Sequence, residues 1–424
     1  MENNNTNFDM ILIRYGEMTL KKDNYKLFLR QIINNIKFKL KEFKNIRLEW
    51  QMYRFFIYLN GEDHNKIIEK LNEIVGLHSY SLCKKVNKNI DEISSSSISL
   101  INEYVNEHNI KNYTFKVETA RSDKNFPLTS LEISKEVASK ILPKLEGVKV
   151  DVHNPDICLN IDFRIEAVYL YINAIKGLGG YPSHIQGKGL SMMSGGIDSP
   201  VASYLALKKG ITISAMHFYS PPYTSRSALQ KVISLTEKIS KYDAYESIDL
   251  YIVPFTKIQE NIHKYANNTY MITLMRRAMY KIASRVAIDN NMDCIINGES
   301  VGQVASQTLE SIKVVNEVTN IPIIRPLVAF DKDDIVKISK DIGCFDISIK
   351  PYEDCCTVFV PKHPAIKPSV EIAKEEEQKA NLDELIEDAI NNIIKVKINR
   401  NTNIDAFSID DEMNNTLNED KFDI

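Results

Sequence analysis

Residues 189–200 read Gly-Leu-Ser-Met-Met-Ser-Gly-Gly-Ile-Asp-Ser-Pro, and the second half of the chain can be interpreted outward from them. The run 189–193 is short and mostly apolar, as a buried parallel strand would be. Ser199 is suited to cap a helix that begins at Pro200. A second apolar run, 211–218, follows. The pattern predicts strand, loop, helix and strand, which is the repeating unit of a parallel sheet.

The loop between the first strand and the helix suits an anion. Gly195 and Gly196 let the backbone come close to a ligand, and the helix N-terminus offers unpaired N–H groups and a positive dipole end. The sequence contains no Gly-x-x-x-x-Gly-Lys-Ser/Thr, and no Gly-x-Gly-x-x-Gly that would open a helix. Kinase and dehydrogenase interpretations therefore lose their main support. The loop resembles the pyrophosphatase-type loop of the adenine-nucleotide alpha-hydrolase group.

Composition sets the class of protein. The 424 residues are 26% charged and 44% hydrophobic, which is typical of a globular chain of two or three domains. We see no membrane-length apolar run and no signal peptide at the N-terminus, so we expect a cytoplasmic protein without a membrane partner. The net charge is −3. Residues 371–424 carry −9, which leaves a mildly basic body of +6 that is compatible with RNA.

Periodicity and composition divide the chain into five parts. Residues 1–76 alternate strands and helices, and residues 77–176 form a second α+β module. A glycine-rich linker, 177–189, precedes an α/β domain at 190–396. An acidic and polar tail, 397–424, is expected to be disordered.

Polar residues at the expected carboxyl ends of strands are candidates for nucleotide binding, because ligands of open parallel sheets bind there. His217 and Phe218 end one strand, although a buried structural histidine is the alternative. Gly298 and Gln307 lie in a loop after another strand, and a plain polar loop is the alternative there. Of Arg276 and its neighbour on a predicted helix, we expect one at the surface and one able to reach phosphate.

Two further groups of residues are candidates for catalysis. Lys332 is expected in the first turn of a helix, where a cation is slightly unfavourable, so a role in neutralising phosphate charge would explain it. A solvated lysine is the alternative. Cys355 and Cys356 follow Glu353 and Asp354, which raise a thiol pKa. Sulfur transfer fits this pair better than a protease dyad, because a persulfide needs only an accessible thiol and a donor.

The loop 119–127 combines basic and aromatic residues. Arg121 and Lys124 can grip phosphates, and Phe126 can stack on a base. The alternative is a solvated loop with one buried phenylalanine.

Six motifs in one order resemble the tRNA 4-thiouridine synthetase family (ThiI), or tRNA sulfurtransferases, over about residues 8–395. They are Arg-Tyr-Gly-Glu (14–17), Arg-Ser-Asp-Lys-Asn-Phe-Pro (121–127), Ser-Gly-Gly-Ile-Asp-Ser (194–199), Gly-Glu-Ser-Val-Gly-Gln-Val-Ala-Ser-Gln-Thr (298–308), Arg-Pro-Leu (325–327) and Pro-Tyr-Glu-Asp-Cys-Cys-Thr-Val-Phe (351–359). The resemblance implies an N-terminal ferredoxin-like domain, a THUMP domain that binds tRNA, and a pyrophosphatase-loop (PP-loop) domain.

The resemblance also implies a site and a reaction. ATP would enter with Mg²⁺, without a tightly bound metal, and Asp198 and Lys332 would support adenylation of uridine 8 in tRNA. Persulfide sulfur on Cys356 would then replace AMP and give 4-thiouridine. The residues implied or expected at the ATP site are Met192, Met193, Ser194, Gly195, Gly196, Ser199, His217, Phe218, Arg276, Gly298 and Gln307.

Some family members carry a C-terminal rhodanese domain with a second cysteine, whereas no cysteine follows Cys356 here. We therefore expect another protein, a cysteine desulfurase, to donate sulfur, with Cys355 or an external thiol as reductant. The resemblance also implies a homodimer and a link to thiamine synthesis through a carrier protein. A non-catalytic RNA-binding module and a different adenylating enzyme are the alternatives.

Overall fold

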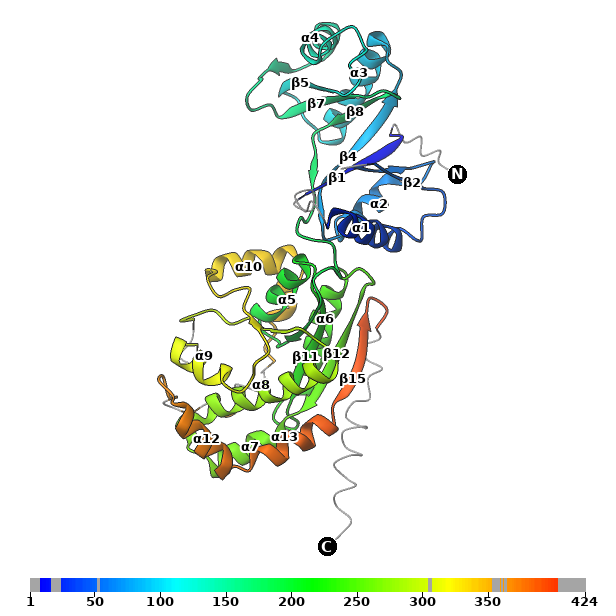
Figure 1. Cartoon of the computed structure of the whole chain (residues 1–424). Coiled ribbons are helices and arrows are strands. Elements are labelled where there is room, and N and C mark those ends of the chain that lie inside the picture. The colour runs from blue at the N-terminus through cyan, green and yellow to red at the C-terminus, as the bar shows by residue number, and fades with distance from the viewer. Residues whose placement is uncertain are drawn as a thin grey trace. The chain divides into compact units, whose positions relative to one another are not determined.

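The structure is a computed structural model that describes residues 8–16, 24–51, 54–303, 307–352, 359, 361 and 364–402. The chain divides into two compact units, Met1–Tyr181 and Pro182–Ile424 (Figure 1). None of the described helices is long and apolar enough to span a membrane.

The first unit begins with a ferredoxin-like βαββαβ arrangement. Its strands lie in the antiparallel order β2-β3-β1-β4, and α1 and α2 pack beside each other. The elements are β1 (Met10–Tyr15), α1 (Tyr25–Lys39), β2 (Arg47–Gln51), β3 (Arg54–Tyr58), α2 (His64–Leu71) and β4 (Leu77–Val86). The strand β3, which follows β2 directly, is not part of the alternation of strands and helices predicted for residues 1–76.

The second half of this unit continues the same sheet. The long strand β4 pairs with β1 through its first residues and with β8 through Lys84–Val86, so the order continues as β4-β8-β7-β5-β6, with β9 also paired to β4. The elements are α3 (Ile90–Glu107), β5 (Tyr113–Arg121), α4 (Ser130–Ile141), the 3₁₀ turn η2 (Leu142–Lys144), β6 (Val148–Val150), β7 (Ile157–Phe163), β8 (Val168–Ile172) and β9 (Ile175–Lys176). Met10, Phe56, Cys83 and Tyr169 pack in one apolar cluster that joins the two halves.

The second unit is a parallel α/β sheet in the order β14-β13-β10-β11-β12, closed at one edge by the antiparallel strand β15. Its strands are β10 (Lys188–Met192), β11 (Thr212–Tyr219), β12 (Ser247–Pro254), β13 (Cys294–Ile296), β14 (Ile323–Ile324) and β15 (Ile394–Asn399). Because β15 reaches Asn399, residues 397–399 belong to the sheet and not to the predicted tail. Residues 403–424 lie outside the described part.

Helices cover both faces of this sheet (Figure 1). Apolar residues of α7, α8 and α13 form one core with Leu190, Met216, Phe218 and Val253, whereas α5 and α6 contact the strands from the other face. The helices are α5 (Asp198–Lys208), α6 (Arg226–Ser240), α7 (Thr256–Tyr265), η3 (Asn268–Tyr270), α8 (Met271–Asp289), α9 (Leu309–Asn316), α10 (Lys332–Asp341), α11 (Phe345–Ser348), α12 (Val370–Lys379) and α13 (Leu382–Asn391).

Candidate active site

The loops that follow β10 and β13 meet at the point where the strand order changes direction. From β10 the chain adds β11 and β12 on one side, and it later returns to place β13 and β14 on the other. In open parallel sheets a crevice forms at this switch point, beyond the carboxyl ends of the strands, and ligands bind there. The motif at 194–199 and the loop after residue 297 thus come together.

The glycine-rich loop is held by its own hydroxyl groups. The Ser194 N–H donates to Ser199 Oγ at 2.9 Å, and the Gly196 N–H donates to Ser194 Oγ at 3.3 Å. The prediction that Ser199 caps a helix beginning at Pro200 is wrong, because α5 begins at Asp198. Ser199 lies inside the first turn, and its hydroxyl closes the loop instead. Pro200 is tolerated because first-turn N–H groups need no helical partner.

Asp198 is the meeting point of three chain segments. One carboxylate oxygen accepts a hydrogen bond from the Lys332 ammonium at 2.5 Å, and the other accepts one from the Gln303 amide at 3.1 Å. Lys332 is the first residue of α10, as expected, and Asp331 occupies the N-cap without a side-chain cap bond. Lys332 therefore pairs with an acidic residue of the phosphate loop, although its side chain remains 45% exposed, and its role in adenylation stays a prediction.

Gly298 allows the two loops to touch. A Cβ at this position would lie 2.8 Å from the backbone carbon of Asp198 and 2.9 Å from the nitrogen of Ser199. Such distances are too short for real contacts, so only glycine fits without a shift. The loop is held at its start by Asn297, whose amide donates to the Tyr280 hydroxyl.

Glu299 is the centre of a cluster of charged residues, and it is not among the site residues predicted from the sequence. It is 8% exposed, and its carboxylate pairs with Arg276 and with Arg325, the latter at 2.7 Å. The expectation of one surface arginine is wrong, because Arg277 is also buried and pairs with Glu377 at 2.8 Å. A buried cation requires a partner, and acidic side chains of distant segments provide it. An acidic residue directly after a buried strand was the available signal for Glu299.

The end of β11 presents two different side chains. His217 is buried, with its Nδ1 3.1 Å from the Met193 carbonyl oxygen, and it faces the phosphate loop. Phe218 points to the other face and packs against Phe255 at 5.1 Å between ring centroids. Whether Phe218 contacts a nucleotide stays a prediction. Met192 ends β10 and pairs with β11 beside the loop.

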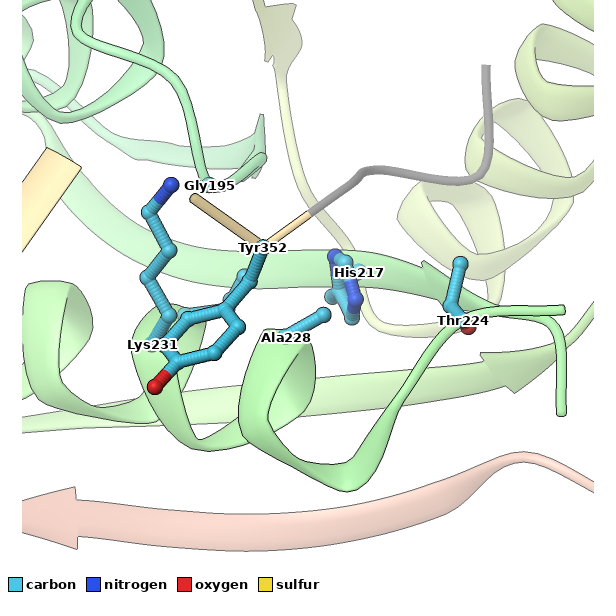
Figure 2. A pocket seen from close by; sticks show the side chains of 7 residues that line it. Gly195, His217, Thr224, Ala228, Lys231 and Tyr352 are labelled. Atoms are coloured by element: carbon cyan, nitrogen blue, oxygen red, sulfur yellow. The ribbon is translucent and has the colours of Figure 1, made fainter. Parts of the chain in front are cut away.

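A narrow pocket lies between the phosphate loop and α6. Gly195, His217, Lys231 and Tyr352 line it, with the lysine and the tyrosine on the side of the loop (Figure 2). Lys231 is 7% exposed, and its ammonium donates to the Lys350 carbonyl at 2.8 Å. Lys231 is not among the site residues predicted from the sequence. The signal was a lysine on the apolar face of a helix.

The Gln307 side chain carries an unsatisfied acceptor. Its amide oxygen is buried and has no hydrogen-bond partner in the described part of the chain. Its backbone carbonyl accepts a hydrogen bond from the Gly302 N–H at 3.0 Å. Buried amide oxygens are normally paired, so an unsatisfied one beside a candidate site is consistent with a ligand contact.

The predicted loop 119–127 is a loop only from Ser122, because β5 reaches Arg121, and internal contacts hold it. The Arg121 guanidinium donates to the carbonyls of Phe126 and Leu128 at 2.7 and 2.8 Å. The Phe126 ring packs on Phe163 with 4.3 Å between centroids, and Lys124 is exposed. Arg121 and Phe126 thus shape the loop, and Lys124 remains available to a ligand.

The four described cysteines are poor nucleophiles. Burial raises the pKa of the thiols of Cys83 and Cys344 to about 12 and that of Cys294 to about 11, and it also raises the pKa of Cys158. Cys355 and Cys356 lie outside the described residues. Among the described residues no cluster of three or more histidine, cysteine, aspartate or glutamate side chains could hold a metal ion.

The parallel sheet, the glycine-rich loop without a Walker lysine, and the Asp198–Lys332 pair at the switch point define the class of PP-loop enzymes. Models of protein families agree in each part of the chain. "Thiamine biosynthesis protein (ThiI)" matches residues 184–382, "ThiI ferredoxin-like domain" matches 10–81, and "THUMP domain" matches 87–173.

Two relatives extend over nearly the whole chain. A "Probable tRNA sulfurtransferase" of Acholeplasma laidlawii (strain PG-8A) is 46% identical over 383 residues, which is 90% of this chain and 92% of the relative. A crystal structure of a 4-thiouridine synthetase–RNA complex with bound ATP is 34% identical, with a TM-score of 0.84, and covers 92% of this chain and 100% of that one. The chain belongs to the ThiI family of tRNA sulfurtransferases, and it is an enzyme.

A more distant structure, PH1313 from Pyrococcus horikoshii Ot3, has a TM-score of 0.60 at 21% identity and covers 79% of this chain and 99% of that one. At this identity the likeness shows a shared fold alone.

Proposed function

We propose that this enzyme transfers sulfur to tRNA at the expense of ATP, converting uridine 8 to 4-thiouridine. The observation that carries the proposal is the 2.5 Å pair between Lys332 and Asp198 beside the phosphate loop, in a chain that belongs to the sulfurtransferase family. A homologous synthetase binds RNA and ATP, which supports both substrates here.

The loop fits the phosphates of ATP. A Cβ on Gly196 would meet only the Ser194 hydroxyl, at 3.5 Å, so space remains beside the backbone N–H groups. The N-terminus of α5 adds its positive dipole end. The ATP phosphates and Asp198 would hold Mg²⁺, because Mg²⁺ is usually held by substrate phosphates and one or two carboxylates. There it would neutralise charge on the departing pyrophosphate.

Adenylation needs positive charge at the phosphate more than it needs acid–base chemistry. The C4 oxygen of uridine attacks the α-phosphorus, the bond to the β-phosphate oxygen breaks, and pyrophosphate leaves. The Lys332 ammonium would stabilise the charge that develops. Asp198 would orient that ammonium, and the buried, unpaired oxygen of Gln307 would accept a hydrogen bond from the nucleoside.

Sulfur transfer follows on Cys356. The terminal persulfide sulfur attacks C4, the C4–O bond breaks, and AMP leaves with the former C4 oxygen. A thiolate of Cys355 or of an external thiol then attacks Cys356 Sγ, which releases 4-thiouridine and forms a disulfide. Two electrons from an external dithiol restore the thiols. The raised pKa values of Cys83, Cys294 and Cys344 support this assignment, because protonated buried thiols react slowly.

Three further proposals follow from family membership. A cysteine desulfurase would load the persulfide, two copies of the chain would form a dimer, and the enzyme would act in the cytoplasm on tRNA. A second acceptor, a carrier protein of thiamine synthesis, is supported by the description of the matching family model. We propose it as a secondary activity.

The test measures 4-thiouridine in tRNA after incubation with ATP, Mg²⁺, cysteine and a desulfurase, for wild type and Cys356→Ala. Product from wild type alone would support both the reaction and the carrier. Product from both would remove Cys356 as the obligatory carrier. With no product from either and an active desulfurase, pyrophosphate release separates the alternatives. RNA-independent release would indicate a different adenylating enzyme, and no release would indicate an RNA-binding protein.

A further inference from the structure

Glu299 joins three segments of the second unit at the carboxyl edge of its sheet. One carboxylate oxygen, Oε1, pairs with the Arg276 guanidinium of α8. The other oxygen, Oε2, accepts a hydrogen bond from Arg325 Nε at 2.7 Å, and Arg325 directly follows β14. Both arginine side chains are largely buried. A single buried carboxylate thus bridges the loop after β13, a helix and the chain beyond the edge strand.

The backbone of Glu299 is held as well. Its N–H donates to the side-chain oxygen of Asn297 at 3.2 Å, and the Asn297 amide donates to the Tyr280 hydroxyl. Tyr280 lies four residues after Arg276 on α8, and residues four apart share one face of a helix. This face of α8 therefore reaches the loop after β13 through two separate side-chain contacts.

The loop that carries Glu299 is also the loop that touches the phosphate loop. Gly298, directly before Glu299, approaches Asp198 so closely that a Cβ would not fit. The Glu299 carboxylate therefore brings two guanidinium groups to the edge of the sheet where ATP is expected. A guanidinium group binds phosphate through charged, paired hydrogen bonds whose geometry depends on its orientation.

We propose that Glu299 is a positioning residue for ATP, which holds the Arg276 guanidinium in the orientation that binds a phosphate of the nucleotide. This inference rests on the proposed function, because it requires ATP as the substrate. An arginine side chain has many rotamers, and fixing it before the ligand arrives removes an entropic cost of binding. Loss of the carboxylate should weaken ATP binding although the arginine is still present.

The next residue of α8 provides a matched control. Arg277 pairs with Glu377 of α12 at 2.8 Å, and Glu377 is 7% exposed, compared with 8% for Glu299. Two adjacent arginines thus have equally buried glutamate partners. Glu299 follows the glycine that touches the phosphate loop, whereas Glu377 holds α8 against α12. Either substitution by glutamine removes a buried charge beside an arginine, so both should lower the midpoint of thermal unfolding.

The experiment measures the Kd for ATP by isothermal titration calorimetry and the KM for ATP in tRNA-dependent pyrophosphate release. In Glu299→Gln we expect both constants to rise roughly tenfold with kcat within about threefold of wild type, because loss of uniform binding raises KM without lowering kcat. In Glu377→Gln both constants should stay within about twofold of wild type despite the lower unfolding midpoint.

A double-mutant cycle with Arg276→Met shows whether Glu299 acts through the arginine. Once the guanidinium is absent, the carboxylate has no group to position, so adding Glu299→Gln should raise the Kd by no more than about twofold further. If Glu299→Gln is too unstable to assay, Glu299→Asp carries the same test. It keeps the charge but is one methylene shorter, so it cannot bridge both arginines and should raise the Kd by roughly threefold.

Three results would overturn the inference. Wild-type affinity for ATP in the Glu299 variants would show that the carboxylate positions nothing for the nucleotide. An equal loss of affinity in Glu377→Gln would show a general effect of a missing buried charge. Additive effects in the cycle would show that Glu299 does not act through Arg276.

The two measurements also separate this inference from the proposed function. Wild-type enzyme that binds ATP but releases no pyrophosphate with tRNA would overturn the proposed reaction alone, because the comparison of Kd values still decides the role of Glu299. Wild-type enzyme that binds no ATP would overturn both.

Discussion

The ammonium nitrogen of Lys332 lies 2.5 Å from a carboxylate oxygen of Asp198, although 134 residues separate the two in the chain. Asp198 is the first residue of α5, and Lys332 is the first residue of α10. A cation in a first turn is unfavourable against the helix dipole, so the carboxylate offsets this cost and holds the ammonium at the phosphate loop.

Lys332→Met should abolish most adenylation without unfolding the protein. Loss of one preorganised electrostatic group at a reaction centre typically lowers kcat by about 10² to 10³. The measurement is tRNA-dependent pyrophosphate release, with thermal unfolding as the check on folding. Lys337→Met, an exposed lysine of the same helix, is the control and should behave as wild type. Unchanged release in Lys332→Met would remove the residue from the mechanism.

Two glycine substitutions should separate loop packing from ATP binding. In Gly298→Ala the new Cβ would lie 2.8 Å from backbone atoms of Asp198, so the loops must move apart, and we expect a loss of about 1–3 kcal/mol in the free energy of unfolding. Gly196→Ala meets no such atom and should retain stability but weaken ATP binding, because the methyl group fills phosphate space. Thermal unfolding with and without ATP distinguishes them. Equal losses of unfolding free energy in the two variants would contradict the assignment of Gly298 to loop packing and of Gly196 to phosphate binding.

Arg277 should be a determinant of stability and not of chemistry. It is 1% exposed and pairs with Glu377 and Glu317. Arg277→Met leaves the buried Glu377 carboxylate with Lys281, 3.1 Å away, as its remaining cationic partner, so we expect a loss of at most about 3 kcal/mol in chemical denaturation. The exposed pair of Arg285 and Asp289 is the control, and Arg285→Met should cost less than about 1 kcal/mol. Similar costs for both variants would be inconsistent with a buried pair.

Alkylation of the folded protein at pH 8 should spare the buried thiols. Because the pKa of Cys344 is raised to about 12 and that of Cys294 to about 11, both remain protonated at this pH, and the thiolate is the form that reacts. Their labelling should become appreciable only as the pH approaches these values or when the protein unfolds. Peptide mass spectrometry after iodoacetamide treatment should find Cys355 and Cys356 labelled first. Early labelling of Cys344 would argue against the assignment of the carrier.

In the first unit, Lys124 and Arg121 should affect RNA binding in different ways. Lys124 is exposed, so Lys124→Ala should weaken tRNA binding and reduce the slope of log K against log salt by about one. Arg121→Ala removes the donor that holds two loop carbonyls, so binding should fall further and protease cleavage of the loop should increase. Lys140→Ala, a lysine paired with Asp91, is the control. Equal binding by all three variants would exclude this loop from the interface.

The sequence alone was sufficient for the features that depend on neighbouring residues. The apolar run before residue 194, the glycine pair and the helix pattern after it predict β10, the loop and α5, because strand and helix periods and the glycine requirement are local properties. The six motifs were likewise sufficient to place the chain in its family. The preference of serine for helix N-caps gave a wrong prediction at Ser199, because the Ser199 hydroxyl accepts a hydrogen bond from Ser194 in the folded loop.

Only the tertiary structure determined which charged groups meet. That Lys332 pairs with Asp198, that Glu299 binds Arg276 and Arg325, and that Arg277 is buried all depend on the packing of the sheet order β14-β13-β10-β11-β12. Periodicity indicates which face of an element is buried, but the partner of a buried charge is set by contacts between segments far apart in the chain.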